Sequence, residues 1–173
     1  MNKTTKNKII EAKMKYYKNK HPIFDETDLN NFRYYTRNCN STNGLTQAII
    51  EYLTWNGCQA ERINTTGRKI STKEIVTDIV GFKKQIGSEH WIKGTGTKGS
   101  PDIHAMIPIV INGKKLAQTL KIEVKYAKDR QSDYQKKYER IVSEMGGIYY
   151  IARNIDDTVE WIDQLLIDYL IES

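Results

Sequence analysis

Two carboxylates and one lysine fall at spacings that can build a metal-dependent site. Asp102 opens one run of alternating apolar residues, and Glu123 and Lys125 lie two residues apart in a second run, TLKIEVKY. Successive side chains of a strand point to opposite faces, so Glu123 and Lys125 share one face, roughly 6–7 Å apart. If the two runs pair with Asp102 near Glu123, their carboxylates converge.

Such a group can do phosphodiester chemistry. Mg²⁺ usually takes one or two carboxylates together with waters and substrate phosphate. When bound, Mg²⁺ or Mn²⁺ polarises a phosphoryl oxygen and supplies hydroxide near neutral pH. We expect Lys125 to orient the attacking water or to help deprotonate it, because the pKa of a buried lysine shifts readily. A solvated strand face is the alternative for an E-x-K triplet alone, and the Gly-Ser-Pro-Asp turn upstream weighs against it.

The charge of the chain is unevenly distributed around this stretch. Residues 1–20 hold seven lysines and one acid, and residues 155–173 hold six acids and no lysine or arginine. From Arg62 to Arg140, 17 basic residues outnumber 8 acidic ones. A basic surface suits a polyanion such as DNA, although a merely soluble surface gives the same charge. Within this basic part, Arg62, Arg68 and Arg130 are expected to hold phosphates.

The stretch Gly94-Thr-Gly-Thr-Lys-Gly99 matches the spacing of a dinucleotide-binding loop. That signature must follow a strand and open a helix, whereas here Ser-Pro-Asp and a strand follow. We therefore expect no nucleotide cofactor. The glycines instead predict a turn that lets phosphate approach the backbone beside Asp102, with Lys98 as a phosphate contact.

Composition and length indicate a soluble globular protein of 173 residues, with 39% hydrophobic and 28% charged residues. No apolar run of transmembrane length and no apolar leader is present, so we expect no membrane association and a cytoplasmic location, in the host if the protein is viral. Two cysteines form neither a ligand cluster nor a disulfide framework. Residues 1–40 are expected to be a basic and aromatic extension, and residues 41–173 the main domain.

The N-terminal twenty residues have two possible interpretations. Blocks of like charge are often flexible arms that bind nucleic acid. Alternatively, Ile10, Met14 and Tyr17 fall at helical spacing, which predicts a basic helix packed on the domain.

The remaining elements can be placed with varying ease. Apolar residues at helical spacing follow Ser41, and a strand leads into the turn before Arg68. Residues 69–93 fit a helix by period, but their β-branched residues favour a hairpin. Ser132 starts a later helix, followed by a short buried strand at 148–152 and a last helix at 156–171. This order predicts an α/β fold with a mixed central sheet flanked by helices.

These motifs together resemble one nuclease superfamily. The series GSPDI, a hairpin, IEVK and a Ser-x-x-Gln helix start looks like the PD-(D/E)XK, or restriction-endonuclease-like, superfamily. Within it the pattern is most similar to the VRR-NUC family of small virus-type replication and repair nucleases. The resemblance covers about Leu45 to Trp161 and implies an αβββαβ core.

The resemblance also assigns roles to residues. Asp102, Glu123 and Lys125 fall on the D…E-x-K positions, and Gln135 falls on the glutamine of the following helix. It implies that the Val124 carbonyl helps to bind metal and that Glu51, in the first helix, is a third metal carboxylate. A surface glutamate is the alternative for Glu51. Ser132 and Gln135 also have capping-box spacing, and we expect one amide not to serve both the cap and the site. Ser132 is included among the DNA-contacting residues.

The expected function is a Mg²⁺- or Mn²⁺-dependent DNA endonuclease. The resemblance to Holliday-junction resolvases implies action on branched DNA by a homodimer, in DNA repair or recombination of a phage-like kind. Two alternatives stay open: a restriction-type or general DNase, and a non-catalytic DNA-binding module with a relic site. The intact set of Asp102, Glu123 and Lys125 weighs against a relic.

Overall fold

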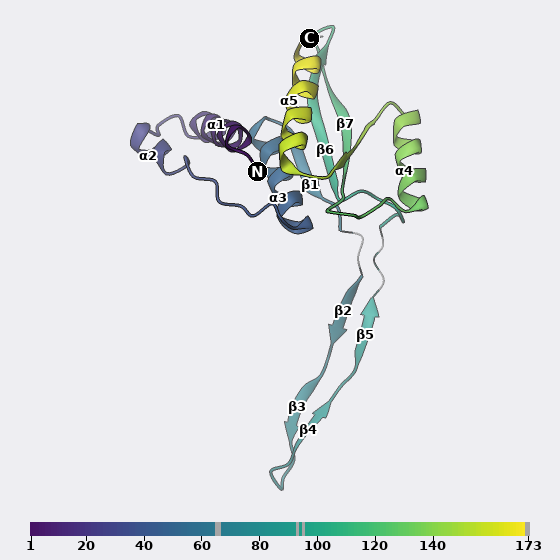
Figure 1. The fold of residues 1–173 in the computed structure, drawn as a ribbon. Helices are drawn as coiled ribbons and strands as arrows, with labels where there is room; N and C mark the ends of the chain where they lie inside the picture. The colour runs from purple at the N-terminus through teal and green to yellow at the C-terminus, as the bar shows by residue number, and fades with distance from the viewer. Residues whose placement is uncertain (65–66, 93, 95, 172–173) are drawn as a thin grey trace.

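The chain folds around a mixed four-stranded sheet flanked by helices (Figure 1). The computed structural model describes residues 1–64, 67–92, 94 and 96–171. The strands run in the order β1 (Gln59–Arg62), β6 (Ile103–Ile111), β7 (Lys114–Val124) and β8 (Ile148–Ala152). The first three are antiparallel, and β8 lies parallel to β7. The predicted mixed α/β fold is confirmed at this level.

A tight turn sets the register of the central hairpin. Asn112 and Gly113 connect β6 to β7 with positive φ angles of 51° and 74°, which an Asn-Gly pair adopts at little cost. From this turn the pairing runs back without interruption to Ile103 opposite Ile122. Extended by one residue, the same register sets Asp102 beside Glu123. The turn therefore determines which carboxylates meet about nine residues away.

One face of the sheet forms the hydrophobic core. Alternate residues of β6 and β7, namely Ile103, Ala105, Ile107, Leu120 and Ile122, are buried as the alternation predicts. They lie under α3 (Thr42–Trp55) and α5 (Ile155–Ile171). The Ser41 side chain accepts the Gly44 N–H and begins α3, and Gly57, with a φ of 86°, follows its end. α4 (Asp133–Glu144) packs against β8, beside the face that carries Glu123.

The lysine-rich N-terminus is a packed helix. α1 (Lys3–Lys20) lies against α3 and α5, and the short α2 (Glu26–Asn30) follows it. Ile9 is completely buried, and Lys8 pairs with Asp163 of α5 at 2.6 Å. The expectation of a flexible arm is therefore wrong for this segment. The fully buried face carries Ile9 and Ala12, and the predicted residues 10, 14 and 17 are only partly buried.

Residues 67–92 form a long two-stranded arm. β2 (Arg68–Ser71) pairs with β5 (Glu89–Ile92), and further out β3 (Glu74–Thr77) pairs with β4 (Lys83–Ile86). The arm is inserted between the paired strands β1 and β6 and extends away from the sheet (Figure 1). The hairpin interpretation of residues 69–93 is confirmed for its described residues, and Lys93 lies outside them.

Candidate active site

Asp102, Glu123 and Lys125 come together at one end of the sheet. Asp102 immediately precedes β6, and its Oδ2 accepts the backbone N–H of Val124 at 2.9 Å. That bond holds the Asp102 carboxylate beside the last residues of β7. The convergence predicted from the two alternating runs is what the structure contains.

Glu123 is a buried carboxylate with one free oxygen. Its residue is only 3% exposed, and Oε1 accepts hydrogen bonds from Lys125 Nζ at 3.0 Å and from Gln135 Nε2. Oε2 is buried and has no hydrogen-bond partner among the described residues. Burial raises the pKa of Glu123 and the nearby Asp102 charge adds to this, while the Lys125 hydrogen bond opposes it. A buried oxygen without a partner is costly, and it is suited to a cation.

Lys125 lies between two acids. It is 6% exposed, and its Nζ lies 3.0 Å from Glu123 Oε1 and 3.4 Å from Asp129 Oδ2. Burial lowers the pKa of Lys125, but the hydrogen bond and charge of Glu123, helped by Asp129, outweigh it and raise the pKa overall. Lys125 therefore keeps its proton at neutral pH. Orienting the attacking water suits a protonated lysine, and the other expected role, help in deprotonating that water, stays a prediction.

Gln135 performs two functions at once. Its side-chain Oε1 accepts the backbone N–H of Ser132 at 2.9 Å, and the backbone N–H of Gln135 donates to Ser132 Oγ. The two bonds complete a capping box at the start of α4. Its Nε2 donates to Glu123 Oε1. The expectation that one amide cannot serve both the cap and the site is wrong, because the two roles use opposite ends of the amide.

Glu51 does not join this cluster. Its carboxylate accepts hydrogen bonds from Tyr35 Oη and from the Arg37 guanidinium, in the segment before α3. Among the described residues, no three His, Cys, Asp or Glu side chains gather as a metal-binding group. The third metal carboxylate that the resemblance implied is therefore not in place, because Arg37 and Tyr35 hold Glu51 elsewhere.

The remaining predicted contacts have varied surroundings. Val124 is buried and supplies the backbone N–H that holds Asp102. Lys98 Nζ lies 3.7 Å from the centroid of the Tyr134 ring at the start of α4. Arg130 is exposed next to Asp129, and Asp129 Oδ1 accepts the backbone N–H of Arg130.

Two of the predicted arginines lie where the chain passes from the sheet into the arm: Arg62 ends β1 and Arg68 begins β2. Arg62 donates to Asn43 Oδ1 at 2.9 Å, at the end of β1. Arg68 is exposed at the start of the arm, where it pairs with Ile92.

Sequence reasoning missed two residues near the site. Asp129 faces Lys125 from the loop after β7, and its position four residues after that lysine was a usable signal. Tyr149 lies on the face of β8 next to the site, because it pairs with Lys121 two residues before Glu123. Its hydroxyl is buried without a hydrogen-bond partner of ordinary geometry in the described part of the chain. Burial, and then the charge of Glu123, raise the pKa of Tyr149.

The site lies apart from a large hollow among the described residues. That hollow is formed mainly by α1, α5 and the end of α3, and it includes none of the clustered residues. Glu123 and Lys125 are themselves buried, and Arg130 near them is exposed. Within the part of the chain that the structure describes, none of the helices is both long and apolar enough to cross a membrane.

Comparisons with known proteins add no further constraint. No protein-family model, no curated protein and no solved structure matches the chain.

Proposed function

We propose that this protein is a divalent-metal-dependent nuclease that hydrolyses phosphodiester bonds in DNA. The observation that carries the proposal is the buried Oε2 of Glu123, which has no hydrogen-bond partner among the described residues and lies near the carboxylate of Asp102. These oxygens fit Mg²⁺ or Mn²⁺, which need only one or two carboxylates when waters and phosphate complete the shell.

The fold supports the resemblance on which the finer assignment depends. From α3 to β8, with the four strands of the arm left out, the elements follow the order α3, β1, β6, β7, α4, β8; α1 and α2 precede this series and α5 follows it. This is the αβββαβ order that the resemblance to PD-(D/E)XK nucleases implies. The acidic cluster, Asp102 and Glu123, also lies where β6 begins and β7 ends, at the same edge of the two central strands. Membership of the VRR-NUC family remains part of the proposal.

Each residue of the cluster has a distinct task in this proposal. Asp102 and Glu123 Oε2 hold the cation, with the Val124 carbonyl beside them. A bound cation supplies Lewis acidity and a hydroxide near neutral pH. Lys125, which keeps its proton, orients the attacking water and stabilises negative charge that develops on the phosphate. Gln135 fixes the orientation of Glu123 so that Oε2 stays free for the cation.

Cleavage of labelled DNA tests the proposal directly. The protein is incubated with linear, flap and four-way DNA, with and without Mg²⁺ or Mn²⁺. Asp102→Asn keeps an oxygen that can accept the Val124 N–H, so folding should be retained. Its cleavage rate should fall by about 100-fold or more, because a charged metal ligand is lost.

A matched control separates this effect from a general loss of charge. Asp133 has a fully exposed carboxylate at the start of α4, so Asp133→Asn should leave the rate unchanged. Unaltered cleavage by Asp102→Asn would falsify the assignment of the site. Preference for the four-way substrate over linear DNA supports a structure-specific enzyme, and equal rates favour a general DNase.

A further inference from the structure

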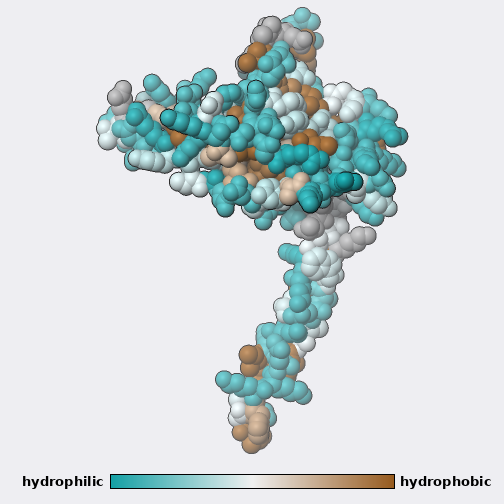
Figure 2. Space-filling model, viewed as in Figure 1, coloured by the Kyte–Doolittle hydropathy of each residue, from teal (hydrophilic) through white to brown (hydrophobic). Residues whose placement is uncertain are grey.

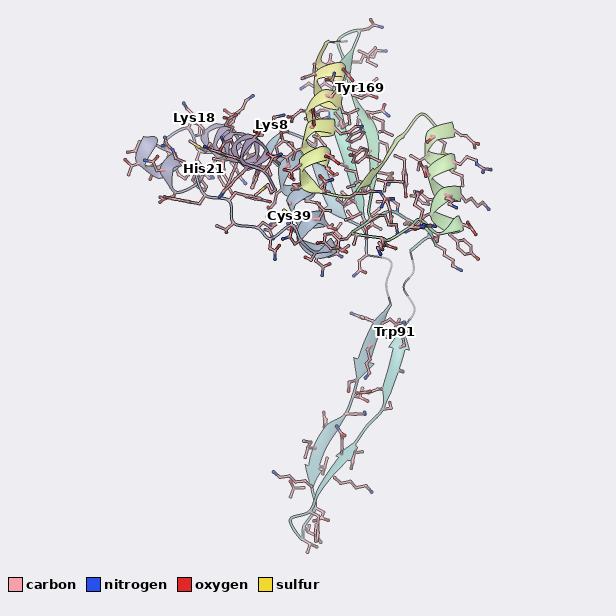
Figure 3. The ribbon with its side chains drawn as sticks, in the orientation of Figure 1. Lys8, Lys18, His21, Cys39, Trp91 and Tyr169 are labelled. Carbon is pink, nitrogen blue, oxygen red and sulfur yellow. The ribbon has the colours of Figure 1, made fainter. Side chains whose placement is uncertain are left out.

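The arm presents apolar residues where nothing in the described chain covers them. Figure 2 shows hydrophobic residues near its far end, and Figure 3 shows side chains projecting from the ribbon of the arm, with Trp91 near its root. The exposed apolar residues of the arm are Ile75, Val76, Ile79, Val80, Phe82, Ile86, Trp91 and Ile92. Such a concentration marks an interaction surface.

The turn at the end of the arm is built to hold this arrangement. Asp78 Oδ1 accepts the backbone N–H groups of Val80 and Phe82, each at 2.9 Å, and the Asp78 N–H donates to Phe82 O. The backbone of the turn is thus satisfied internally. Ile79 is fully exposed and Phe82 is 71% exposed, so both side chains point outward from a defined turn.

Lysines lie among the apolar residues of the arm. Val76 pairs with Lys84, and Thr77 pairs with Lys83. Because paired residues share a face of the ribbon, one face near the tip carries Lys84 beside Val76 and the other carries Lys83 beside Thr77. In the described structure neither lysine has an ion pair. Lysine is depleted in protein–protein interfaces, whereas the phosphates of DNA neutralise its charge. The two lysines therefore favour DNA over a protein as the partner of the arm.

The arm is also placed and sized for DNA. It leaves the sheet after Arg62 and returns at Asp102, and Ile63 N donates to Asp102 O at 2.8 Å. Ten residues from Arg68 to Thr77 extend roughly 30 Å at the usual rise of a strand. One turn of duplex DNA is about 34–36 Å long, and its major groove accepts a two-stranded ribbon.

From these observations we infer that the arm is a branch-reading element for DNA. Its Ile79–Phe82 tip packs against unstacked bases about one helical turn from the arm's first paired residue, Arg68, and Lys83 and Lys84 contact the adjacent phosphates. Other proteins insert Ile or Phe wedges between base steps in the same way. Branched DNA offers unpaired or unstacked bases without the energy needed to open a duplex. The inference rests on the proposed function for the nature of its ligand, and it names branched DNA as the preferred one.

The test measures binding without cleavage. Full-length protein in EDTA is titrated against four-way and linear DNA, with 2-aminopurine at the branch point to report unstacking. Ile79→Ser/Phe82→Ser should weaken junction binding by about tenfold and duplex binding by less than about threefold, as removal of a base-stacking side chain requires. It should also remove the 2-aminopurine signal. Ile23→Ser, which removes another exposed isoleucine, should change neither.

The lysines have their own measurement. Lys83→Gln/Lys84→Gln should lower the slope of log affinity against log salt by about 2, because each phosphate that a lysine neutralises contributes about 0.9 to the slope. The matched control, Lys114→Gln/Lys115→Gln, changes two exposed lysines at the opposite end of the sheet and should leave the slope as it was. Because all four lysines are exposed, the melting temperature should not move.

Several results would overturn the inference. Unchanged junction binding by the tip variant excludes a role in reading branches. If the mass of this variant in light scattering instead falls from two chains to one, and its affinity for both DNA substrates falls equally, the arm is a contact between two copies of the chain. Tip-dependent binding to phosphatidylserine vesicles, with DNA binding unaffected, makes it a membrane contact.

The EDTA assay also separates this inference from the proposed function. If no metal supports cleavage but the tip variant still loses junction binding, the nuclease proposal fails and the arm's role stands. If cleavage occurs and the arm variants bind normally, only the arm's role fails.

Discussion

The Gln135 amide donates to Glu123 Oε1 with one end and accepts the Ser132 N–H with the other. The start of α4 is therefore tied to the buried carboxylate of β7 through one side chain. As a consequence, the cap that begins the helix also determines which oxygen of Glu123 is left free.

Removal of the two partners of this cap should have separable effects. Ser132→Ala removes the cap hydroxyl and should lower the free energy of unfolding by about 1 kcal/mol, with little change in cleavage rate. Gln135→Ala should cause a similar loss and also slow cleavage by about tenfold or more, as expected when a partner that orients a metal ligand is removed. Denaturant titration and single-turnover cleavage measure the two effects. Equal cleavage rates for both variants would show that Gln135 is only a capping residue.

Glu51 should matter for stability and not for chemistry. Its carboxylate binds Arg37 and Tyr35, and it lies outside the acidic cluster. Glu51→Ala should lower the free energy of unfolding by about 1–3 kcal/mol, because Tyr35 and Arg37 lose their acceptor. The metal-dependent cleavage rate should stay within about twofold of wild type, since a residue away from the reacting atoms does not stabilise the transition state. Loss of cleavage in a folded variant would restore Glu51 as a metal ligand.

The packing of α1 predicts a structural effect of its apolar residues. Ile9→Ala should lower the free energy of unfolding by about 2–5 kcal/mol, as is usual for a fully buried aliphatic side chain. Ile23→Ala, at a site 91% exposed, should change stability by less than about 0.5 kcal/mol. Urea unfolding checks both. If Ile9→Ala leaves stability unchanged and flattens the plot of log DNA affinity against log salt, residues 1–20 act as a free basic arm.

Asp156 should make stability depend on pH in the acid range. Burial alone would raise the pKa of Asp156, but hydrogen bonds from the Thr5 side chain and the Asn2 N–H hold it below its usual value. A carboxyl with a depressed folded-state pKa contributes stability above its unfolded pKa of about 3.9 and loses it as pH falls through the folded value. Wild type should therefore lose more thermal stability below about pH 4 than Asp156→Asn does. If the melting temperatures of the two proteins fall in parallel between pH 6 and pH 2.5, Asp156 does not contribute this pH dependence.

If the protein resolves four-way DNA junctions as proposed, two symmetric cuts require two copies of the site, so we expect a homodimer. α4 leaves Tyr134 and Ile141 substantially exposed, and Met145 just after it is 82% exposed, so this face is the expected contact. Light scattering at micromolar concentration should give about twice the chain mass of 20.1 kDa. Ile141→Ser/Met145→Ser should shift the mass toward one chain. Junction cleavage by a protein with the mass of one chain would contradict the dimer.

The central hairpin could be predicted from sequence because its determinants are local. Alternation in two runs indicated which residues face the core, although Tyr126 at the end of the second run is 40% exposed. The convergence of Asp102 and Glu123 was predicted on the condition that the two runs pair there, and the structure meets that condition through the register set by Asn112 and Gly113. The long hairpin was harder to recognise, because exposed β-branched residues fit no buried face.

The errors concern interactions across the chain. Seven lysines made residues 1–20 look solvated, yet long lysine side chains extend to water while Ile9 on the same helix is buried. Glu51 was misplaced because its partners, Tyr35 and Arg37, come from an irregular segment without any periodic signal. The double use of Gln135 was missed because the side-chain orientation that links α4 to β7 has no counterpart in residue spacing.

The separation of the arm from the sheet has an evolutionary consequence. Residues 67–92 pair mainly with one another and add no residue to the buried core. Substitutions there change the stability of the sheet little, since most exposed positions tolerate replacement. Selection can therefore alter the length and tip of the arm while the acidic cluster stays intact. Related proteins are expected to share the cluster and differ most in this insertion, so that one chemistry is directed to different targets.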